Sequence, residues 1–258
     1  MSDYKIFNRH QKIQNIRHKL KLSEVSLGSW IQIGNTSVAE IMGKSGYDWV
    51  ALDLEHGVFS QGELAALNMA IELGGTLPLA RVAQSHPKDI KIALDAGAGG
   101  IILPMIENAQ QLSQAIDAAC WPPVGRRGVG FSRANLFGSN FEDYKQEAQE
   151  PLMVAMIENI NAVNELDKIL QLKKLDAIFI GPYDLSASMG ITAQFEHSDF
   201  KKVLQTINDK CKQYNVASGI HVVKPSKNEL EDKIKQGYRF IAYSIDAVFL
   251  TTSAKIEV

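Results

Sequence analysis

Cysteine is nearly absent from this chain, which has only Cys120 and Cys211, placed far apart. Two such residues build neither a disulfide framework nor a cluster of thiolate metal ligands. Long hydrophobic runs are absent too, because no stretch approaches the roughly 18 apolar residues that a membrane-spanning helix needs. These absences favour a protein of a reducing compartment, the cytoplasm, that does not enter a membrane.

An excess of charge of either sign is also lacking. The net charge is −2 and the isoelectric point is about 6.3, so no overall basic field attracts nucleic acid or an anionic membrane. Hydrophobic residues make up 45% and charged residues 22% of the chain, which is usual for a globular protein. The 258 residues suffice for a full core and match the typical length of one (β/α)8 barrel.

The first 24 residues form a basic amphipathic segment, in which Lys, Arg and His interleave with apolar residues such as Ile13, Ile16 and Leu20. A transit peptide has this composition. A leading helix that packs its apolar stripe across one end of a barrel has it as well. We expect the leading helix over residues 1–24, within a single domain that spans residues 1–258.

Eight short apolar runs, rich in β-branched residues, alternate along the chain with stretches that carry helix signals. This alternation around one core predicts parallel strands covered by helices. No Gly-x-Gly-x-x-Gly turn follows the first run, so a dinucleotide-binding open sheet lacks its phosphate site. Eight units in this length favour an α/β fold, a (β/α)8 TIM barrel with an extra N-terminal helix. The predicted strands are Leu27–Ile31, Trp49–Leu54, Leu77–Val82, Gly100–Leu103, Leu152–Ile157, Ala177–Ile180, Ala217–Val222 and Phe240–Ser244.

The segments between the strands carry helix-start signals and one oversized connection. Capping-box spacing occurs at Ser37–Glu40, Ser60–Glu63 and Ser226–Glu229. Between the fourth and fifth strands, a helix near Ala109–Ala119 is followed by a long segment that ends near Glu150. A connection of this length inside a compact domain is usually functional or part of an interface.

Charged residues gather where the second and third strands end, which is where such barrels carry their active sites. Strand alternation turns Asp53 and Glu55 toward the barrel interior, and buried carboxylates need a partner or a metal. Arg81 on the third strand needs an anion, either one of these acids in a salt bridge or a substrate. Asp95 ends a helix, where its charge opposes the helix dipole, so we expect an outside partner such as His56.

Two further carboxylates follow apolar strands, Glu158 after the fifth and Asp184 after the sixth. Two hard oxygen ligands, with the rest of the shell left to water and substrate, suit Mg²⁺ or Mn²⁺. Helix capping is the alternative for each acid, most of all for Asp184. A lysine nucleophile that forms a Schiff base is the competing chemistry, but the predicted strands contain no lysine, and Lys224 lies in a loop just beyond the seventh.

Taken together, these residues resemble the HpcH/HpaI aldolase family, also called the 2-keto-3-deoxy sugar-acid or 2,4-dihydroxyhept-2-enedioate aldolases. The resemblance runs from about Leu27 to Leu250. Its most specific pieces, in matching order and separation, are Asp53–Gly57, Pro122–Gly130, Met156–Glu158 and Gly181–Ser186.

The resemblance implies a class II pyruvate aldolase, a metal-dependent carbon–carbon lyase that reversibly cleaves a 4-hydroxy-2-oxo acid into pyruvate and an aldehyde. The implied cofactor is Mg²⁺, Mn²⁺ or Co²⁺, and the implied assembly is a homo-oligomer, typically a hexamer with exchanged C-terminal helices. The final helix is expected near Asp246–Ser253. The implied roles are metal binding for Glu158 and Asp184, acid–base chemistry for His56 and Asp95, contact with the oxo group for Arg81, and binding of the substrate carboxylate by backbone amides at Gly181 and Pro182. We also expect Trp30 to contact substrate, and Glu55 and Arg127 to support the site from behind.

Two other interpretations remain open at this point. A lyase that acts on CoA thioesters, like the citrate lyase β-subunit, would need a nucleotide cleft, and no basic cluster marks one. A non-catalytic binding protein on the same scaffold would be expected to have lost one of the proposed ligands or acid–base residues. The sequence fixes neither the aldehyde partner nor the metal.

Overall fold

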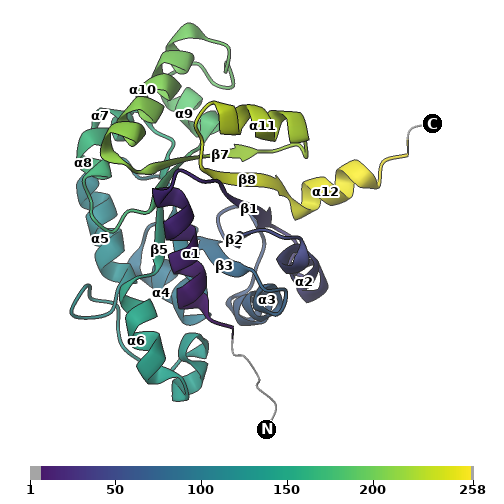
Figure 1. Ribbon diagram of the computed structural model, residues 1–258, viewed down its shortest axis with the longest axis vertical. Helices are drawn as coiled ribbons and strands as arrows, with labels where there is room; N and C mark the ends of the chain where they lie inside the picture. The colour runs from purple at the N-terminus through teal and green to yellow at the C-terminus, as the bar shows by residue number, and fades with distance from the viewer. Residues whose placement is uncertain (1–6, 257–258) are drawn as a thin grey trace.

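The computed structural model describes residues 7–256, and these residues form a closed barrel of eight parallel strands in chain order (Figure 1). The eight predicted strands are confirmed to within one residue at each end. Residues 1–6 of the predicted leading helix, like residues 257–258 at the other end of the predicted domain, lie outside the described range. The strands are β1 (Ser26–Ile31), β2 (Trp49–Asp53), β3 (Leu77–Arg81), β4 (Gly100–Leu103), β5 (Leu152–Ile157), β6 (Ala177–Ile180), β7 (Ala217–Val222) and β8 (Phe240–Ile245).

Helices surround the barrel and return the chain from the end of each strand to the start of the next (Figure 1). No helix of the described residues is long and apolar enough to cross a membrane. The helices are α1 (Arg9–Lys21), α2 (Thr36–Lys44), α3 (Gln61–Leu73), α4 (Pro87–Asp95), α5 (Ala109–Ala119), α6 (Phe141–Gln149), α7 (Ile160–Asn164), α8 (Leu166–Leu170), α9 (Pro182–Ser188), α10 (Ser198–Tyr214), α11 (Lys227–Lys235) and α12 (Asp246–Ser253), with a 3-10 segment, η1 (Arg133–Gly138).

Two of the three predicted capping boxes mark real helix starts. Ser60 caps α3 with Glu63 in a capping box, and the Ser226 side chain accepts the backbone N–H of Glu229 at the start of α11. The prediction for Ser37 was wrong, because the side chain of Asn35 accepts the N–H of Ser37 and α2 begins two residues earlier. Asparagine is as good an N-cap as serine, and it comes first in the chain.

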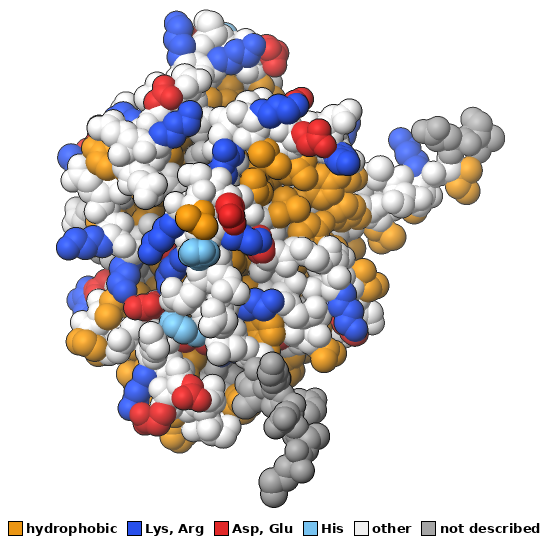
Figure 2. Space-filling model, in the orientation of Figure 1, with side chains coloured by type: hydrophobic (Ala, Val, Ile, Leu, Met, Phe, Trp, Pro, Cys, Tyr) orange, Lys and Arg blue, Asp and Glu red, His pale blue; other side chains and the backbone are white. Residues whose placement is uncertain are grey.

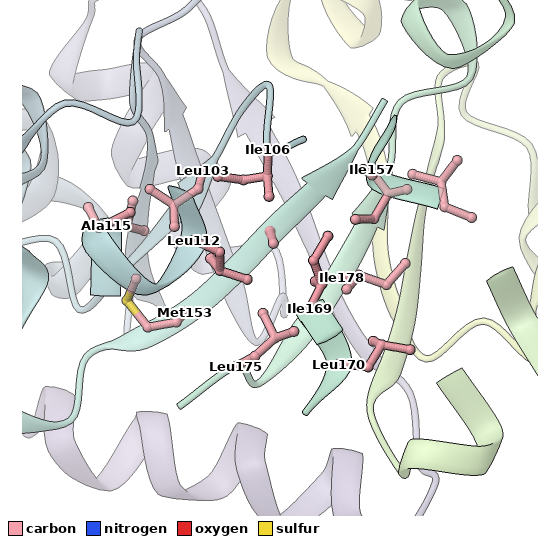
Figure 3. Packing of buried hydrophobic residues seen from close by; sticks show 14 of the residues in the cluster. Leu103, Ile106, Leu112, Ala115, Met153, Ile157, Ile169, Leu170, Leu175 and Ile178 are labelled. Atoms are coloured by element: carbon pink, nitrogen blue, oxygen red, sulfur yellow. The ribbon is translucent and has the colours of Figure 1, made fainter. Parts of the chain in front are cut away.

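Strand alternation divides the strand side chains into two buried sets. One set faces the helices, and Figure 3 shows part of it, with Leu103 and Met153 of neighbouring strands packed near Leu112 of α5. The other set fills the barrel interior, where the rings of Trp49 and Phe240 stack at 4.5 Å. The barrel is therefore a packed core rather than a pore, and a ligand can enter only at its ends.

Helix α1 covers the amino-terminal end of the barrel. Its Ile13 and Ile16 are buried with the barrel-interior set, as expected for a leading helix with an apolar stripe. Arg9 of α1 donates to Glu147 of α6 at 2.7 Å and to Glu72 of α3 at 2.9 Å. Arg17 of α1 forms a paired hydrogen bond to Asp176 at 2.7 and 3.0 Å.

The long connection between β4 and β5 folds against this same covered end. It contains η1 and α6, and Trp121, Ala134, Tyr144 and Ala148 form a small buried cluster within it. Arg133 of η1 also pairs with Glu72 of α3. The connection therefore has its own core and is tied to the rest of the barrel by charged side chains.

The last helix, α12, has the predicted bounds but leaves the barrel wall and points outward (Figure 1). Phe249 lies 6.0 Å from the ring of Tyr243 on β8, while Leu250 remains 60% exposed. Figure 2 shows hydrophobic side chains gathered below α11, over β8 and at the base of α12. An apolar surface beside α11 and the base of α12 is therefore left exposed.

Candidate active site

The carboxyl-terminal ends of the strands open into one pocket of about 620 Å³. Active sites of this architecture lie at that end. Eight of the residues that the sequence singled out line the pocket together, although they come from five different strands or the loops after them. They are Trp30, Asp53, His56, Arg81, Glu158, Gly181, Pro182 and Asp184.

Arg81 is held in the pocket by acids from the neighbouring strand. Its Nε and Nη2 donate to the two carboxylate oxygens of Asp53 at 2.8 and 2.7 Å, and its Nη1 lies 3.2 Å from Glu55. The guanidinium also lies 4.8 Å from the ring of Trp30. Of the two partners left open by the sequence, the salt bridge is thus present within the chain, and the guanidinium is fixed in one orientation.

Asp53 is the buried anchor of this arrangement. It also accepts Gln32 Nε2 at 2.7 Å, and the backbone N–H groups of Glu55 and His56 lie 3.3 Å from its Oδ1. Burial alone would raise the pKa of Asp53, but the hydrogen bonds and the charge of Arg81 outweigh it and hold the pKa below its usual value. Asp53 therefore stays ionised and keeps Arg81 in place.

Glu158, after β5, is buried at the side of the pocket and lacks a cationic partner within the described residues. The backbone N–H of Met105 donates to its Oε1 at 2.5 Å. The pKa of Glu158 is raised to about 7, mainly by burial and also by the negative charges of Glu55 and Asp184, against the Met105 hydrogen bond and the charge of Arg81. Three carboxylates thus repel one another around this part of the pocket.

A glycine keeps space open beside the other oxygen of Glu158. A Cβ atom on Gly181 would lie 2.7 Å from Glu158 Oε2, so any larger residue there would displace the carboxylate. Gly181 donates its own N–H to Ile157 at 3.2 Å, and Pro182 has no N–H. The predicted carboxylate-binding amides therefore cannot be those of Gly181 and Pro182 themselves; the next ones along the chain belong to Tyr183 and Asp184.

Asp184 lies in the first turn of α9 and is exposed to the pocket. No described residue donates a side-chain or capping hydrogen bond to its carboxylate, so the capping alternative does not account for it. Among residues 7–256, no group of three or more His, Cys, Asp or Glu side chains is arranged to hold a metal. Two carboxylate oxygen donors, mutual repulsion and open space beside Glu158 nevertheless fit a hard divalent cation that takes its other ligands from water and substrate.

His56 and Asp95 are not paired within the chain, which corrects the expectation for this pair. His56 lies at the pocket with 63% of its side chain exposed, and its Nε2 is 4.0 Å from Glu55. Asp95 instead bonds to Lys91 at 2.5 Å and to Arg127 at 3.1 Å. The physical reason is direction: β2 carries His56 to the carboxyl-terminal end of the barrel, whereas α4 runs back and leaves Asp95 near the start of β4.

Arg127 also lies away from the pocket, so the prediction that it supports the site from behind is wrong within one chain. It is buried, donates to the Tyr144 hydroxyl at 3.0 Å, and lies 5.6 Å from the ring of Trp121. Its contacts hold the long connection onto α4. Glu55, in contrast, does stand behind the pocket through its contact with Arg81.

His221 is a pocket residue that was not predicted from the sequence. This histidine lies on β7 and lines the pocket, while Ile220 and Val222 on either side pack outward among the helix-facing residues. That alternation was readable in the sequence and was the signal that could have found it. Lys224 does not line the pocket, so the lysine considered for a Schiff base stands outside it.

Comparison with known proteins gives consistent matches over nearly the whole chain. The family model described as HpcH/HpaI aldolase/citrate lyase matches residues 26–252. The chain is 32% identical over 237 residues to 2-dehydro-3,6-dideoxy-6-sulfogluconate aldolase of Pseudomonas putida, covering 91% of this chain and 92% of that one. It is 32% identical over 250 residues to hydroxypyruvate/pyruvate aldolase of Roseobacter denitrificans, covering 94% and 95%.

A solved structure shows the same fold at similar identity. It is an HpcH/HpaI aldolase/citrate lyase family protein from Burkholderia cenocepacia, with a TM-score of 0.86 and 30% sequence identity. The match covers 93% of this chain and 96% of that one. Sequence and structure therefore point to the same group of proteins.

Proposed function

Because the chain belongs to the HpcH/HpaI aldolase/citrate lyase family, we propose that it is a metal-dependent pyruvate aldolase that uses the pocket around Glu158, Asp184 and Arg81. The reaction is the reversible cleavage of a 4-hydroxy-2-oxo acid into pyruvate and an aldehyde. The observation that carries the proposal is that two carboxylates without cationic partners face the same pocket as a rigidly held arginine.

Glu158 and Asp184 are the residues that would hold the divalent cation, Mg²⁺, Mn²⁺ or Co²⁺. When bound, the cation supplies a Lewis acid that polarises the oxo group of the substrate and stabilises negative charge on its oxygen. The space that Gly181 leaves beside Glu158 keeps that carboxylate accessible from the pocket. The free N–H groups at the start of α9 would receive the substrate carboxylate in this proposal.

Arg81 faces the oxo oxygen in this proposal. Asp53 occupies its Nε and Nη2, so the guanidinium meets the substrate already oriented and no reorganisation is needed as charge develops. Trp30 lies against the guanidinium at 4.8 Å and closes the pocket on that side. Glu55 shares the same guanidinium and limits its movement.

His56 is the proposed group for proton transfer. It takes the proton of the C4 hydroxyl, the O–H electrons become the second bond of the aldehyde carbonyl, and the C3–C4 bond breaks. The electron pair of that bond moves into the enolate, whose oxygen faces Arg81. Return of a proton to C3 gives pyruvate, and the reverse sequence is aldol addition.

We further propose a homo-oligomer, with a hexamer as the family resemblance implies. Helix α12 leaves the barrel while apolar side chains remain exposed beside it (Figures 1 and 2), so α12 of a second copy has a complementary surface to cover. An oligomer would also give Asp95 a route to His56 of another copy, since the two cannot meet within one chain. Cys120 and Cys211 are buried and unpaired, in keeping with a cytoplasmic setting.

The two alternative functions receive less support. A non-catalytic scaffold protein would have lost a pocket residue, whereas Glu158, Asp184, Arg81 and His56 all line the pocket. A CoA-thioester lyase needs a nucleotide cleft. It is also less supported by the relatives with about one third identity over nine tenths of the chain, because they carry aldolase names.

Pyruvate release from a panel of 4-hydroxy-2-oxo acids, measured with and without EDTA, tests the proposal. Activity should disappear on chelation and return when Mg²⁺, Mn²⁺ or Co²⁺ is added back. Glu158→Gln should abolish it while leaving the far-UV circular dichroism unchanged. Activity that survives complete chelation and is trapped by borohydride would overturn the metal assignment in favour of a lysine Schiff base.

A further inference from the structure

His221 is a polar residue in an otherwise largely apolar part of the pocket wall. Its ring lies 6.1 Å from the ring of Trp30, and Trp30 in turn lies against the guanidinium of Arg81. His221 thus shares Trp30 as a neighbour, and the same pocket, with Arg81, the group proposed to meet the substrate oxo oxygen. The mechanism described above gives it no role.

The hydrogen bond of the ring fixes which nitrogen carries the proton. His221 Nε2 lies 3.2 Å from the backbone oxygen of Ser244. A carbonyl oxygen can only accept, so Nε2 is the donor. In the neutral ring Nδ1 then has no proton and presents a lone pair.

The Ser244 oxygen is itself held in place. It also accepts the hydroxyl of Ser29 at 3.1 Å, and the Ser244 hydroxyl donates to Val223 at 2.9 Å. Ser244 has a φ of +57°, a conformation that a non-glycine residue adopts only when its surroundings impose it. The partner of Nε2 is therefore rigid, and the orientation of the ring is set by the backbone of β8.

Nδ1 has no donor among residues 7–256 and is not one of their fully buried, unpartnered side-chain atoms, so it retains access to the pocket. The pKa of His221 is lowered to about 4, mainly by burial and also by the nearby positive charge of Arg81, against the Ser244 hydrogen bond and the charge of Asp53. The ring is accordingly neutral at pH 7. The same positive charge of Arg81 makes Nδ1 a poor place for a cation and leaves a hydroxyl as the natural ligand.

We infer that His221 Nδ1 accepts a hydrogen bond from a hydroxyl on C3 of the substrate, which makes this enzyme selective for 3-hydroxylated 2-oxo acids. The inference rests on the proposed function, because C3 is placed by assigning the oxo oxygen to Arg81. C3 is one bond from the oxo carbon, and His221 and Arg81 both lie against Trp30 and are near enough for the charge of Arg81 to act on the His221 ring. In the direction of synthesis the preferred carbon nucleophile is then hydroxypyruvate, and in cleavage the preferred substrate is a 3,4-dihydroxy-2-oxo acid.

Binding a hydroxyl and rejecting an analogue that lacks one differ in free energy. A site built to bond a hydroxyl discriminates strongly against an analogue that lacks it, because its buried polar atom is then left without a partner. 2-Oxobutyrate is the sharpest comparison with hydroxypyruvate, since a methyl group replaces a hydroxyl of nearly the same size. Pyruvate, with only hydrogen at that position, completes the series.

The experiment measures kcat/KM for aldol addition of pyruvate, 2-oxobutyrate and hydroxypyruvate to one aldehyde, with wild-type enzyme and the His221→Leu and His221→Asn variants. Wild type should prefer hydroxypyruvate to 2-oxobutyrate. His221→Leu should lower this ratio about ten- to a hundredfold, the range expected when a buried acceptor is removed, and His221→Asn, which keeps an acceptor oxygen, should retain part of the preference. Met156→Leu, a change elsewhere in the pocket lining, serves as the comparison variant.

The outcomes separate this inference from the proposed function. If wild type uses none of the three donors with any added metal, the proposed function fails. If wild type is active but its hydroxypyruvate to 2-oxobutyrate ratio is the same in His221→Leu and in Met156→Leu, the assignment of His221 is overturned. Should His221→Leu fail to fold, the wild-type ratio and the His221→Asn ratio still decide, because a wild type that favours 2-oxobutyrate contradicts the inference directly.

Discussion

Asp53 and Arg81 stand directly opposite each other on neighbouring strands, as the last register pair of β2 and β3. The two side chains join through paired hydrogen bonds of 2.8 and 2.7 Å, and Asp53 is fully buried while Arg81 reaches the pocket. Strand register therefore fixes the position of a charged group of the active site. The same pair of residues therefore contributes to the folding free energy of the barrel and orients Arg81 for the proposed reaction.

Replacing Asp53 tests that connection. Asp53→Asn removes the charge that compensates Arg81 and should cost about 3 kcal/mol of folding free energy, as breaking a buried pair does. It should also lower kcat, because Arg81 is freed from its orientation. Urea denaturation and steady-state kinetics measure the two effects. Asp167→Asn, which breaks a partly exposed pair with Lys210 on the outside of the barrel, should have a much smaller effect on both; equal effects of both variants would refute the argument.

Gly181→Ala tests the space beside Glu158. The new Cβ would lie 2.7 Å from Glu158 Oε2, so the carboxylate must move, and metal affinity should fall tenfold or more, on the order of the loss for a disturbed ligand. Gly130→Ala is the control, because no atom lies within 4 Å of the Cβ it would add. Metal titration followed by calorimetry gives the affinities. A Gly181→Ala enzyme with wild-type affinity would show that Glu158 is not a ligand.

The metal-free protein should become less stable as the pH rises through Glu158. The folded-state pKa of this acid is raised to about 7 from 4.5, so between these values the folded state binds the extra proton. The contribution of Glu158 to the free energy of unfolding is complete below pH 4.5. It is lost as the pH rises to about 7, and the loss is up to roughly 3 kcal/mol at 1.36 kcal/mol per pKa unit. Denaturation in EDTA across this range measures the slope, and Glu158→Gln should remove this contribution. An unchanged pH profile in that variant would contradict the assignment.

We expect His221 to contribute to the pH dependence of stability with the opposite sign. Its folded-state pKa is lowered to about 4 from 6.5, so in this interval the unfolded state binds the extra proton. The stability it confers is complete above pH 6.5 and is lost as the pH falls toward 4. The difference between wild type and His221→Asn in denaturation midpoint should therefore shrink on acidification. A difference independent of pH would show that the ring is not buried in its neutral form.

Removal of helix α12 should disrupt the proposed homo-oligomer. The full chain should elute as an oligomer with light-scattering mass near six chains, and a chain shortened after Ile245 should give smaller species, because the exposed face around Leu250 is lost. Leu250→Asp is the point-variant version of the same test, and Val58→Asp, at an exposed residue before α3, is its control. A full chain that is monomeric at micromolar concentration would end the proposal.

The sequence predicted most of the barrel because each strand is a short apolar run between clear helix signals. All eight strands lie within one residue of their predicted bounds, and α5 and α12 match theirs. The start of α2 was misplaced because two good capping residues, Asn35 and Ser37, stand close together and only the structure decides between them.

The candidate site was predictable where strand direction and alternation decide, and not where distant segments must meet. Arg81 ends a strand and Glu158, Asp184 and His56 follow strands, so their common pocket could be expected. Asp95 was assigned a partner at the other end of the barrel because a helix-end acid reveals a need for a partner but not its place. Arg127 found its partners within the long connection, whose path the sequence does not specify.

Helix α1 holds together the end of the barrel that lies opposite the pocket. The single side chain of Arg9 in α1 bonds to Glu72 of α3, to Glu147 of α6 and to the backbone oxygen of Ala134 in η1. Segments far apart in the chain are therefore locked together at the end of the barrel where no substrate enters. Laboratory evolution of new substrate ranges should for this reason tolerate wide variation in the loops around the pocket, while even conservative changes at Arg9 or Glu72 should be rejected for lost solubility.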